Sequence, residues 1–171
     1  MDYRRRYTVI GLVALAIILV LVVTAPLMAP YGSFIGLDGK PGVIDGGWDG
    51  HGIAGAFYAL GDLFCHQEQA RSLIVNGSQM PLCVRDVGIL CGLVIGFLAC
   101  VPLGHRLGDG RYPVLGLALI AVMVVEWAVE TTGFDSQTLR MLTGISAGFG
   151  ASLILVWMLY RNRGWDAGER Y

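Results

Sequence analysis

The stretch YTVIGLVALAIILVLVVT, residues 7–24, contains no charged side chain and directly follows Arg4, Arg5 and Arg6. A helix needs roughly 20 predominantly apolar residues to cross the hydrocarbon core of a bilayer. The stretch therefore predicts a membrane-spanning helix that begins on the cytoplasmic side. Its apolar run exceeds that of a secretory signal peptide, so we expect an uncleaved anchor.

Three later segments have the same character, and we expect them to span the membrane over residues 87–103, 114–131 and 139–160. Of the 171 residues, 55% are hydrophobic and 15% are charged. Soluble domains contain about 25% charged residues, so this composition is typical of a membrane protein. The sequence predicts an all-α integral membrane protein of four transmembrane helices, with residues 1–171 forming a single membrane domain.

The distribution of arginine orients these four spans. With the N-terminus inside, the cytoplasmic segments contain eight arginines and the exterior segments contain four cationic residues, an excess that the positive-inside rule predicts. The cytoplasmic set is Arg4, Arg5, Arg6, Arg106, Arg111, Arg161, Arg163 and Arg170, and the exterior set is Lys40, Arg71, Arg85 and Arg140. We therefore expect a multi-pass protein of the cell membrane with both termini in the cytoplasm.

A shorter apolar segment, GIAGAFYALGDLF at residues 52–64, lies in the first exterior loop. It has only 13 residues and contains Asp62, so it suits an interfacial or re-entrant helix better than a full span. We expect this extracytoplasmic helical segment to cover residues 52–76. If it crossed the membrane instead, every later loop would change sides and the arginine bias would disappear.

Glycines recur every four residues in the second span, at Gly88, Gly92 and Gly96, and the fourth span contains Gly144 and Gly148. Residues four apart share one face of a helix, and small residues there let membrane helices approach closely. We expect the second and fourth spans to pack tightly, within the chain or across a homo-oligomer or membrane complex. The lipid bilayer is the other expected partner, and a net charge of −1 argues against nucleic acid.

Polar groups that are costly near lipid gather on the predicted exterior side. The third span brings Glu126 and Glu130 to one helix face near that side, and Arg140 opens the fourth span at the same level. A carboxylate at this level needs a cationic partner, and Arg140 or Arg85 is the nearest candidate. The structural interpretation is an ion pair between Glu130 and Arg140, whereas the deeper position of Glu126 favours a functional role for that residue. The other members of this group are Cys65, His66, Gln67, Arg71, Cys83, Arg85 and Asp86.

Three hypotheses remain open for the exterior cysteines. Cys65 and Cys83 could form a disulfide that closes a loop of about 18 residues and stabilises the fold by about 3 kcal/mol. Alternatively, Cys65, His66 and Cys83 could bind a soft or borderline metal such as zinc or copper, with a glutamate as the fourth ligand. The third hypothesis is a reactive thiolate whose pKa is lowered by an arginine or a protonated His66, or thiols that are merely buried.

The same residues resemble a family of small archaeal and bacterial membrane proteins known mainly as a domain of unknown function. Its members contain Cys-His-Gln, Arg-Ser, Pro-x-Cys-x-Arg-x-x-Gly-Ile and Leu-Arg-x-Leu-Thr-Gly, which here begin at Cys65, Arg71, Pro81 and Leu139. The resemblance covers roughly residues 57–148. Members often have Asp-Gly and Gln where this chain has Glu126-Trp127 and Glu130. The resemblance implies a shared exterior site but no reaction. The residues of this site are Cys65, His66, Gln67, Arg71, Cys83, Arg85 and Arg140.

The leading hypothesis is a metal-binding or thiol-redox site at the extracytoplasmic face, in which Gln67 and the arginines orient or neutralise an anionic group. A second hypothesis is an enzyme or carrier for a lipid-linked or phosphorylated substrate. Its phosphate would be held by Arg71, Arg85 and Arg140, and His66 or Glu126 would act as acid or base. A third is a non-catalytic subunit of a membrane complex. The sequence leaves open whether the protein is an enzyme.

Overall fold

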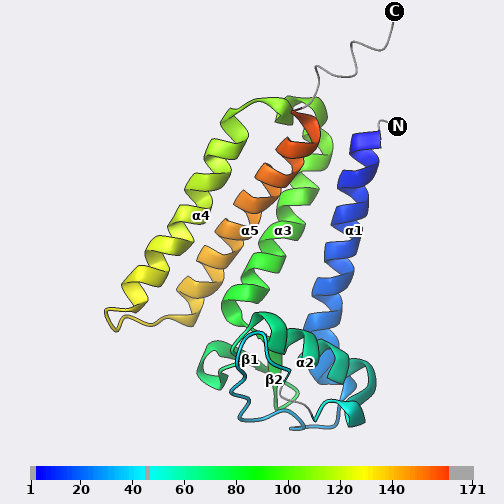
Figure 1. Cartoon of the computed structure of the whole chain (residues 1–171), viewed down its shortest axis with the longest axis vertical. Coiled ribbons are helices and arrows are strands. Elements are labelled where there is room, and N and C mark those ends of the chain that lie inside the picture. The colour runs from blue at the N-terminus through cyan, green and yellow to red at the C-terminus, as the bar shows by residue number, and fades with distance from the viewer. Residues whose placement is uncertain (1–2, 45–46, 162–171) are drawn as a thin grey trace, which may run out of the picture. The chain divides into compact units, whose positions relative to one another are not determined.

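The protein is predominantly helical in a computed structural model that describes residues 3–44 and 47–161. Helices make up 72% of the structure, and a small antiparallel hairpin accounts for the strands (Figure 1). Four helices of the described part are long and apolar enough to cross a membrane. The predicted all-α membrane fold is therefore confirmed.

The four candidate spans begin two to four residues before their predicted starts. The first is α1 (Tyr3–Thr24), which continues into the 3₁₀ turn η1 (Ala25–Met28). The others are α3 (Val84–Leu103), α4 (Arg111–Glu130) and α5 (Gln137–Tyr160). Ser136 caps α5, and its hydroxyl accepts a hydrogen bond from the Leu139 backbone N–H at 3.5 Å. The sides of the membrane on which the termini lie remain a prediction, and Arg163 and Arg170, used for that prediction, lie outside the described residues.

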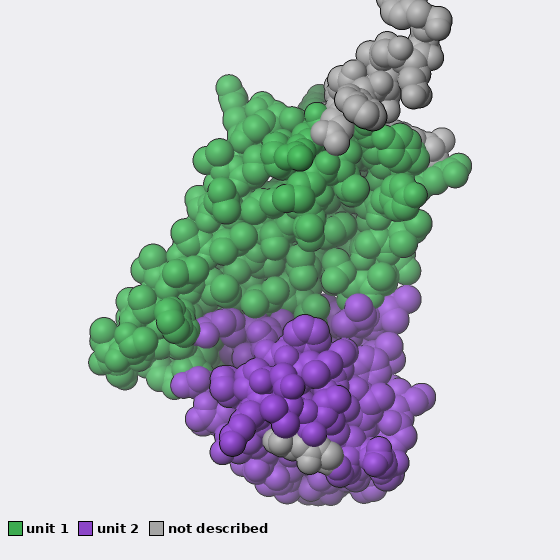
Figure 2. Space-filling model, in the orientation of Figure 1, with its two compact units in different colours: residues 1–16, 88–171 green, residues 17–87 purple. Residues whose placement is uncertain are grey.

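The chain divides into two compact units (Figure 2). Unit 1 contains Met1–Ala16 and Gly88–Tyr171, and unit 2 contains Ile17–Val87. Each has its own cluster of buried side chains, centred in unit 1 on Phe97, Leu107 and Val156 and in unit 2 on Phe34 and Tyr58. The organisation of residues 1–171 as a single membrane domain remains a prediction.

In unit 1 the glycines of α3 lie directly against the backbone of α5. A Cβ atom on Gly88 would be 2.5 Å from the carbonyl oxygen of Met141, and one on Gly92 would overlap the Ile145 backbone. Gly148 has the same relation to the backbone of Ile89. The two helices therefore pack at a distance that only hydrogen side chains permit, which confirms the predicted close packing of the second and fourth spans within the chain.

Helix α4 packs on another side of α5 through a second pair of glycines. A Cβ on Gly116 would lie 2.5 Å from the carbonyl oxygen of Gly150. The Ser146 hydroxyl donates a hydrogen bond to the Leu119 carbonyl at 3.1 Å across the same interface. Close backbone approach and an interhelical hydrogen bond are the two contacts that hold helices together where lipid removes the hydrophobic driving force.

Unit 2 contains the short helix α2 (Gly52–Phe64). Its 13 residues extend about 20 Å, which is less than the roughly 30 Å of a hydrocarbon core. The buried face of α2 packs on the aromatic core of the unit, where the Tyr58 ring stacks on Phe34 with a centroid distance of 3.8 Å. Residues on that face are Ala54, Gly55, Tyr58, Gly61 and Asp62.

The helical segment expected over residues 52–76 is wrong beyond Phe64. After a short irregular stretch and the 3₁₀ turn η3 (Gln69–Arg71), the chain forms the antiparallel strands β1 (Ser72–Val75) and β2 (Ser78–Cys83). Asn76 and Gly77 connect them with φ angles of 54° and 68°. An Asn-Gly pair adopts this left-handed conformation readily, and a two-residue turn of this kind matches the twist of paired strands. The turn therefore favours a hairpin over continued helix.

Gln79 on β2 connects three parts of unit 2 through its side chain, which is fully buried. Its amide nitrogen donates to the carbonyl oxygen of Gln67 and, at 3.4 Å, to the Ser72 hydroxyl. Its amide oxygen accepts from the Leu37 backbone N–H at 3.2 Å. The side chain thus satisfies backbone groups of two loops that have no secondary structure of their own.

We expect Gln79→Leu to lower the free energy of unfolding by about 2–3 kcal/mol, because the buried Gln67 carbonyl loses its donor. Chemical denaturation of the full chain in detergent, followed by circular dichroism, measures this loss. Gln69→Leu is the matched control, since Gln69 is exposed and should change stability by less than about 0.5 kcal/mol. Equal effects of the two substitutions would contradict the role assigned to Gln79.

Candidate metal centre

Cys65, Cys83 and Asp86 come together in unit 2. One ligand atom from each, the two Sγ atoms and a carboxylate oxygen, lie within 4.8 Å of one another. Cys65 is buried, and the other two side chains are half-buried. Among the described residues, this is the group of histidine, cysteine and acidic side chains whose geometry suits a metal ion.

Cys65 reaches this position because α2 ends there. Its backbone is extended, with φ −131° and ψ 147°, and its N–H donates to the Gly61 carbonyl at 2.8 Å. Two residues later Gln67 has a φ of 49°, which turns the chain back toward the sulfur. The Cys65 Sγ then accepts backbone N–H bonds from Gln67 at 3.4 Å and from Cys83 at 3.2 Å.

Cys83 and Asp86 are placed by the junction between β2 and α3. Cys83 is the last residue of β2 and pairs with Ser72 in the hairpin register. Asp86 lies in the first turn of α3, where a negative charge is favoured by the exposed N–H groups of the helix start. The Cys83 Sγ lies 3.1 Å from the Asp86 Oδ2 and donates to it.

The pKa values of the two thiols are shifted in opposite directions. The pKa of Cys65 is lowered, first by the hydrogen bond from the Cys83 thiol and further by the N–H groups of Gln67 and Cys83. The pKa of Cys83 is raised, first by its bond to Cys65 and then by burial and the Asp86 charge. Cys83 has one S–H, and both the Cys65 sulfur and the Asp86 carboxylate can accept it, so the thiol donates to one of them at a time. The first proton therefore leaves Cys65.

Two thiolates and a carboxylate form a ligand set that suits zinc. Zinc binds cysteine sulfur at about 2.3 Å and carboxylate oxygen at about 2.0–2.2 Å, usually with four ligands in a tetrahedron. In that geometry two sulfurs lie about 3.8 Å apart, which fits the separation of the ligand atoms in this group. Copper(I) prefers sulfur alone, so the carboxylate favours zinc over copper.

His66, which the sequence suggested as a ligand beside the two cysteines, has an exposed side chain and is not part of the three-residue group. It directly follows Cys65 in an extended stretch, where neighbouring side chains point in opposite directions. With Cys65 buried, His66 faces outward. Asp86 takes the place in the group that we had expected His66 to fill.

The side chain of Gln67 makes a structural contact within unit 2. It is buried, and its amide nitrogen donates to the Tyr58 carbonyl at 2.9 Å. Arg71 is exposed and pairs with Glu68 at 3.0 Å. Arg85 is half-buried in the first turn of α3.

Arg140 and the two glutamates belong to unit 1, where the expected ion pair is confirmed. The buried Arg140 pairs with Glu130 and, at 3.1 Å, with Asp135. Glu126, one turn deeper, is buried and accepts a hydrogen bond from the Thr143 hydroxyl at 3.3 Å. These contacts join α4 to α5, so Arg140 is already balanced by two carboxylates.

Sequence analysis placed Asp86 in the exterior polar group but did not include it among the metal ligands. The available signal was its spacing: Asp86 follows Cys83 by three residues and lies in the first turn of an apolar helix, close enough along the chain for the two side chains to meet. The four cysteines of the chain are free thiols in this structure, and a Cys65–Cys83 disulfide remains a prediction.

Comparison with known proteins shows that the group lies inside a region shared with others. A family model described as "Predicted membrane protein (DUF2085)" matches residues 65–154, which is just over half of the chain and includes Cys65, Cys83 and Asp86. The chain is also similar to "Uncharacterized protein MJ1492" of Methanocaldococcus jannaschii, with 33% identity over 101 residues. That alignment covers 57% of this chain and 64% of the relative. No solved structure matches the chain.

Proposed function

Since the chain belongs to this family of predicted membrane proteins, we propose that it binds a zinc ion at the membrane through Cys65, Cys83 and Asp86. The convergence of their three ligand atoms within 4.8 Å is the observation that carries this proposal. The fourth position of the tetrahedron is left to water or to a group of a binding partner, as in open zinc sites. The arginine distribution favours an extracytoplasmic position for this site.

The local backbone supports thiolate ligands in particular. The Cys65 sulfur accepts two N–H bonds, and the helix start at Cys83 and Asp86 favours negative charge. Hydrogen bonds and dipoles of this kind offset part of the repulsion among three anionic ligands before a cation is bound. An ion at this site would also connect the end of α2 to the β2–α3 junction.

The hypothesis of an enzyme or carrier for a phosphorylated substrate ranks lower. Arg71 pairs with Glu68, and Arg140 pairs with Glu130 and Asp135, so two of the three expected phosphate ligands already have acidic partners. Binding a phosphate there would require these pairs to open. A role as a non-catalytic subunit is compatible with zinc binding, because the ion can stabilise the fold without taking part in chemistry.

Elemental analysis of the pure full-length protein tests the proposal. We expect one zinc per chain after incubation with zinc and removal of excess ion, and no retained zinc in the Cys65→Ser/Cys83→Ser variant. Cys91→Ser is the matched control, since Cys91 is a half-buried thiol of α3 outside the group. Masses measured with and without reductant decide the disulfide: a loss of two hydrogens that excludes zinc would replace this proposal with the disulfide hypothesis.

The pH dependence of zinc affinity follows from the two thiol pKa values. The raised pKa of Cys83 keeps that thiol protonated at neutral pH, so each bound ion displaces its proton. We expect the apparent affinity to rise at least about tenfold per pH unit between pH 6 and pH 8. Competition with a chromophoric chelator measures this slope, and an affinity that does not change with pH would contradict thiolate ligation.

A further inference from the structure

Helix α2 carries an apolar face that the rest of unit 2 leaves exposed. Ile53 is 66% exposed and Phe64 is 71% exposed, and Leu60 and Leu63 are also exposed between them. The spacing of these residues is that of one side of a helix. The charged residue of α2, Asp62, is on the opposite face, where it is 1% exposed and accepts the Trp48 indole N–H at 2.7 Å.

This face is continuous with the end of a candidate membrane span. Helix α2 contacts η1, the 3₁₀ turn that extends α1, and Ala25 and Ala29 share a buried cluster with Ala54 and Tyr58. Leu27 and Met28 of η1 are themselves 59% and 48% exposed. The apolar surface of the span therefore passes directly onto α2.

The length of the first span sets the depth of this contact. The uncharged stretch at residues 7–24 is about 27 Å long as a helix, close to the roughly 30 Å of a hydrocarbon core. With the arginines before it at one boundary, η1 would lie at the other. Because α2 packs on η1, it would then lie at the level where acyl chains meet headgroups.

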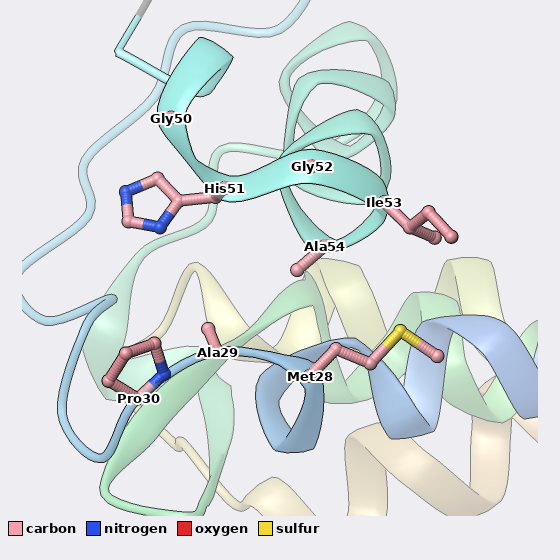
Figure 3. Close-up of a pocket in the computed structure, with 8 residues that line it drawn as sticks. All are labelled: Met28, Ala29, Pro30, Gly50, His51, Gly52, Ile53 and Ala54. Carbon is pink, nitrogen blue, oxygen red and sulfur yellow. The ribbon is translucent and has the colours of Figure 1, made fainter.

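A pocket of about 410 Å³ at the start of α2 shows the same separation of surfaces. Met28 and Ile53 extend to one side of it, whereas the His51 ring and Pro30 lie on the other (Figure 3). The apolar side joins the exposed face of α2. The polar imidazole is thus kept away from the surface that would meet lipid.

We propose that α2 lies along the lipid interface of the membrane that α1 crosses, with Ile53, Leu60, Leu63 and Phe64 among the acyl chains. An interfacial helix of this kind buries its apolar face about 5–10 Å into the headgroup and acyl boundary. Of the interfacial and re-entrant forms expected from the sequence, the geometry points to the interfacial one. This inference does not depend on zinc binding.

Tryptophan quenching by brominated phosphatidylcholine tests the depth of α2. The full-length Leu60→Trp variant is reconstituted in vesicles of this lipid or of its unbrominated form, and the emission of the unsubstituted protein is subtracted. Contact quenching should reduce the intensity of the added tryptophan by about half or more. Val43→Trp is the control, because Val43 is also exposed, lies in a loop beside Lys40 and should be quenched little.

Photolabelling of the unsubstituted protein gives an independent measurement. A membrane-partitioning aryl diazirine should modify residues 53, 60, 63 and 64 as well as the four spans. The inference is overturned if α2 is unlabelled, or if Leu60→Trp is quenched no more than Val43→Trp. A blue-shifted, unquenched Leu60→Trp emission that depends on protein concentration would also overturn it, because a second copy would then cover this face.

Discussion

Cys65→Ser should reduce zinc affinity by about 100-fold or more, because it removes the cysteine whose thiolate form the structure stabilises most. Cys65 is buried, accepts two backbone N–H bonds and has a lowered pKa. A larger fraction of Cys65 than of Cys83 is therefore in the thiolate form that binds zinc. A serine hydroxyl is a far weaker zinc ligand at neutral pH. Cobalt substitution makes the change visible, since the thiolate-to-cobalt charge-transfer band should lose intensity in the variant.

Two further variants distinguish the ligand set given by the structure from the one suggested by the sequence. Asp86→Asn should weaken zinc binding by about tenfold, because an amide oxygen is a neutral and poorer ligand. His66→Ala should leave the affinity unchanged, since that side chain is exposed and outside the group. The reverse result, with His66→Ala weakening binding and Asp86→Asn neutral, would return the site to the three residues expected from the sequence. Full retention of zinc by Cys65→Ser would exclude both sets.

The membrane helices could be predicted because their cause is local. Each span is a run of apolar residues whose backbone must be satisfied within the segment, and composition alone reports that. The tight contact between α3 and α5 was also predictable, since Gly88, Gly92 and Gly96 recur at the spacing of one helix face. The Arg140–Glu130 pair followed from the short connection between α4 and α5, which leaves a buried cation few partners.

The β hairpin was missed although its local signal is strong. Asn76-Gly77 directly follows the apolar residues 73–75, and an Asn-Gly pair after a run of this kind favours a two-residue turn. We had instead expected the preceding helix to continue through these residues. The error matters for the site, because the hairpin register brings Cys83 back beside the end of α2. Without the hairpin, the separation of Cys65 and Cys83 along the sequence gives no reason for their sulfurs to lie together.

The site likewise contains residues that the sequence could identify and residues whose position depends on tertiary contacts. Cys65 and Cys83 could be chosen from chemistry, since two thiols in one exterior segment have few ordinary roles. His66 and Gln67 adjoin Cys65 in sequence, but the extended backbone at Cys65 and the positive φ of Gln67 direct them elsewhere. Such local reversals depend on tertiary contacts, here the bond from the Gln67 amide to Tyr58. The order of residues along the chain does not predict these reversals of side-chain direction.

Gly92→Leu should lower the free energy of unfolding of the full chain by about 4 kcal/mol or more. A Cβ on Gly92 alone would meet the Ile145 carbonyl carbon and the Phe149 backbone nitrogen, each at 2.8 Å. Both are backbone atoms of α5, so relief requires the helices to separate. Separation would also open the contacts of Gly88 and Gly148 along the same interface. A single added side chain therefore acts on the whole α3–α5 contact.

Thermal and chemical unfolding in detergent, followed by circular dichroism, measures this loss. Gly110→Leu is the matched control, because the same residue is introduced at a glycine of unit 1 that has no atom within 4 Å of its added Cβ and a φ of −62°. It should change stability by less than about 0.5 kcal/mol. Gly92→Ala should fall between the two variants, since a methyl group needs a smaller displacement than an isobutyl group. If Gly92→Leu were as stable as Gly110→Leu, α3 and α5 would not be in backbone contact in the membrane. The zinc site offers an internal check, because Cys65, Cys83 and Asp86 all belong to unit 2: zinc retained by a destabilised Gly92→Leu protein would show that unit 2 holds its ligands independently of this contact.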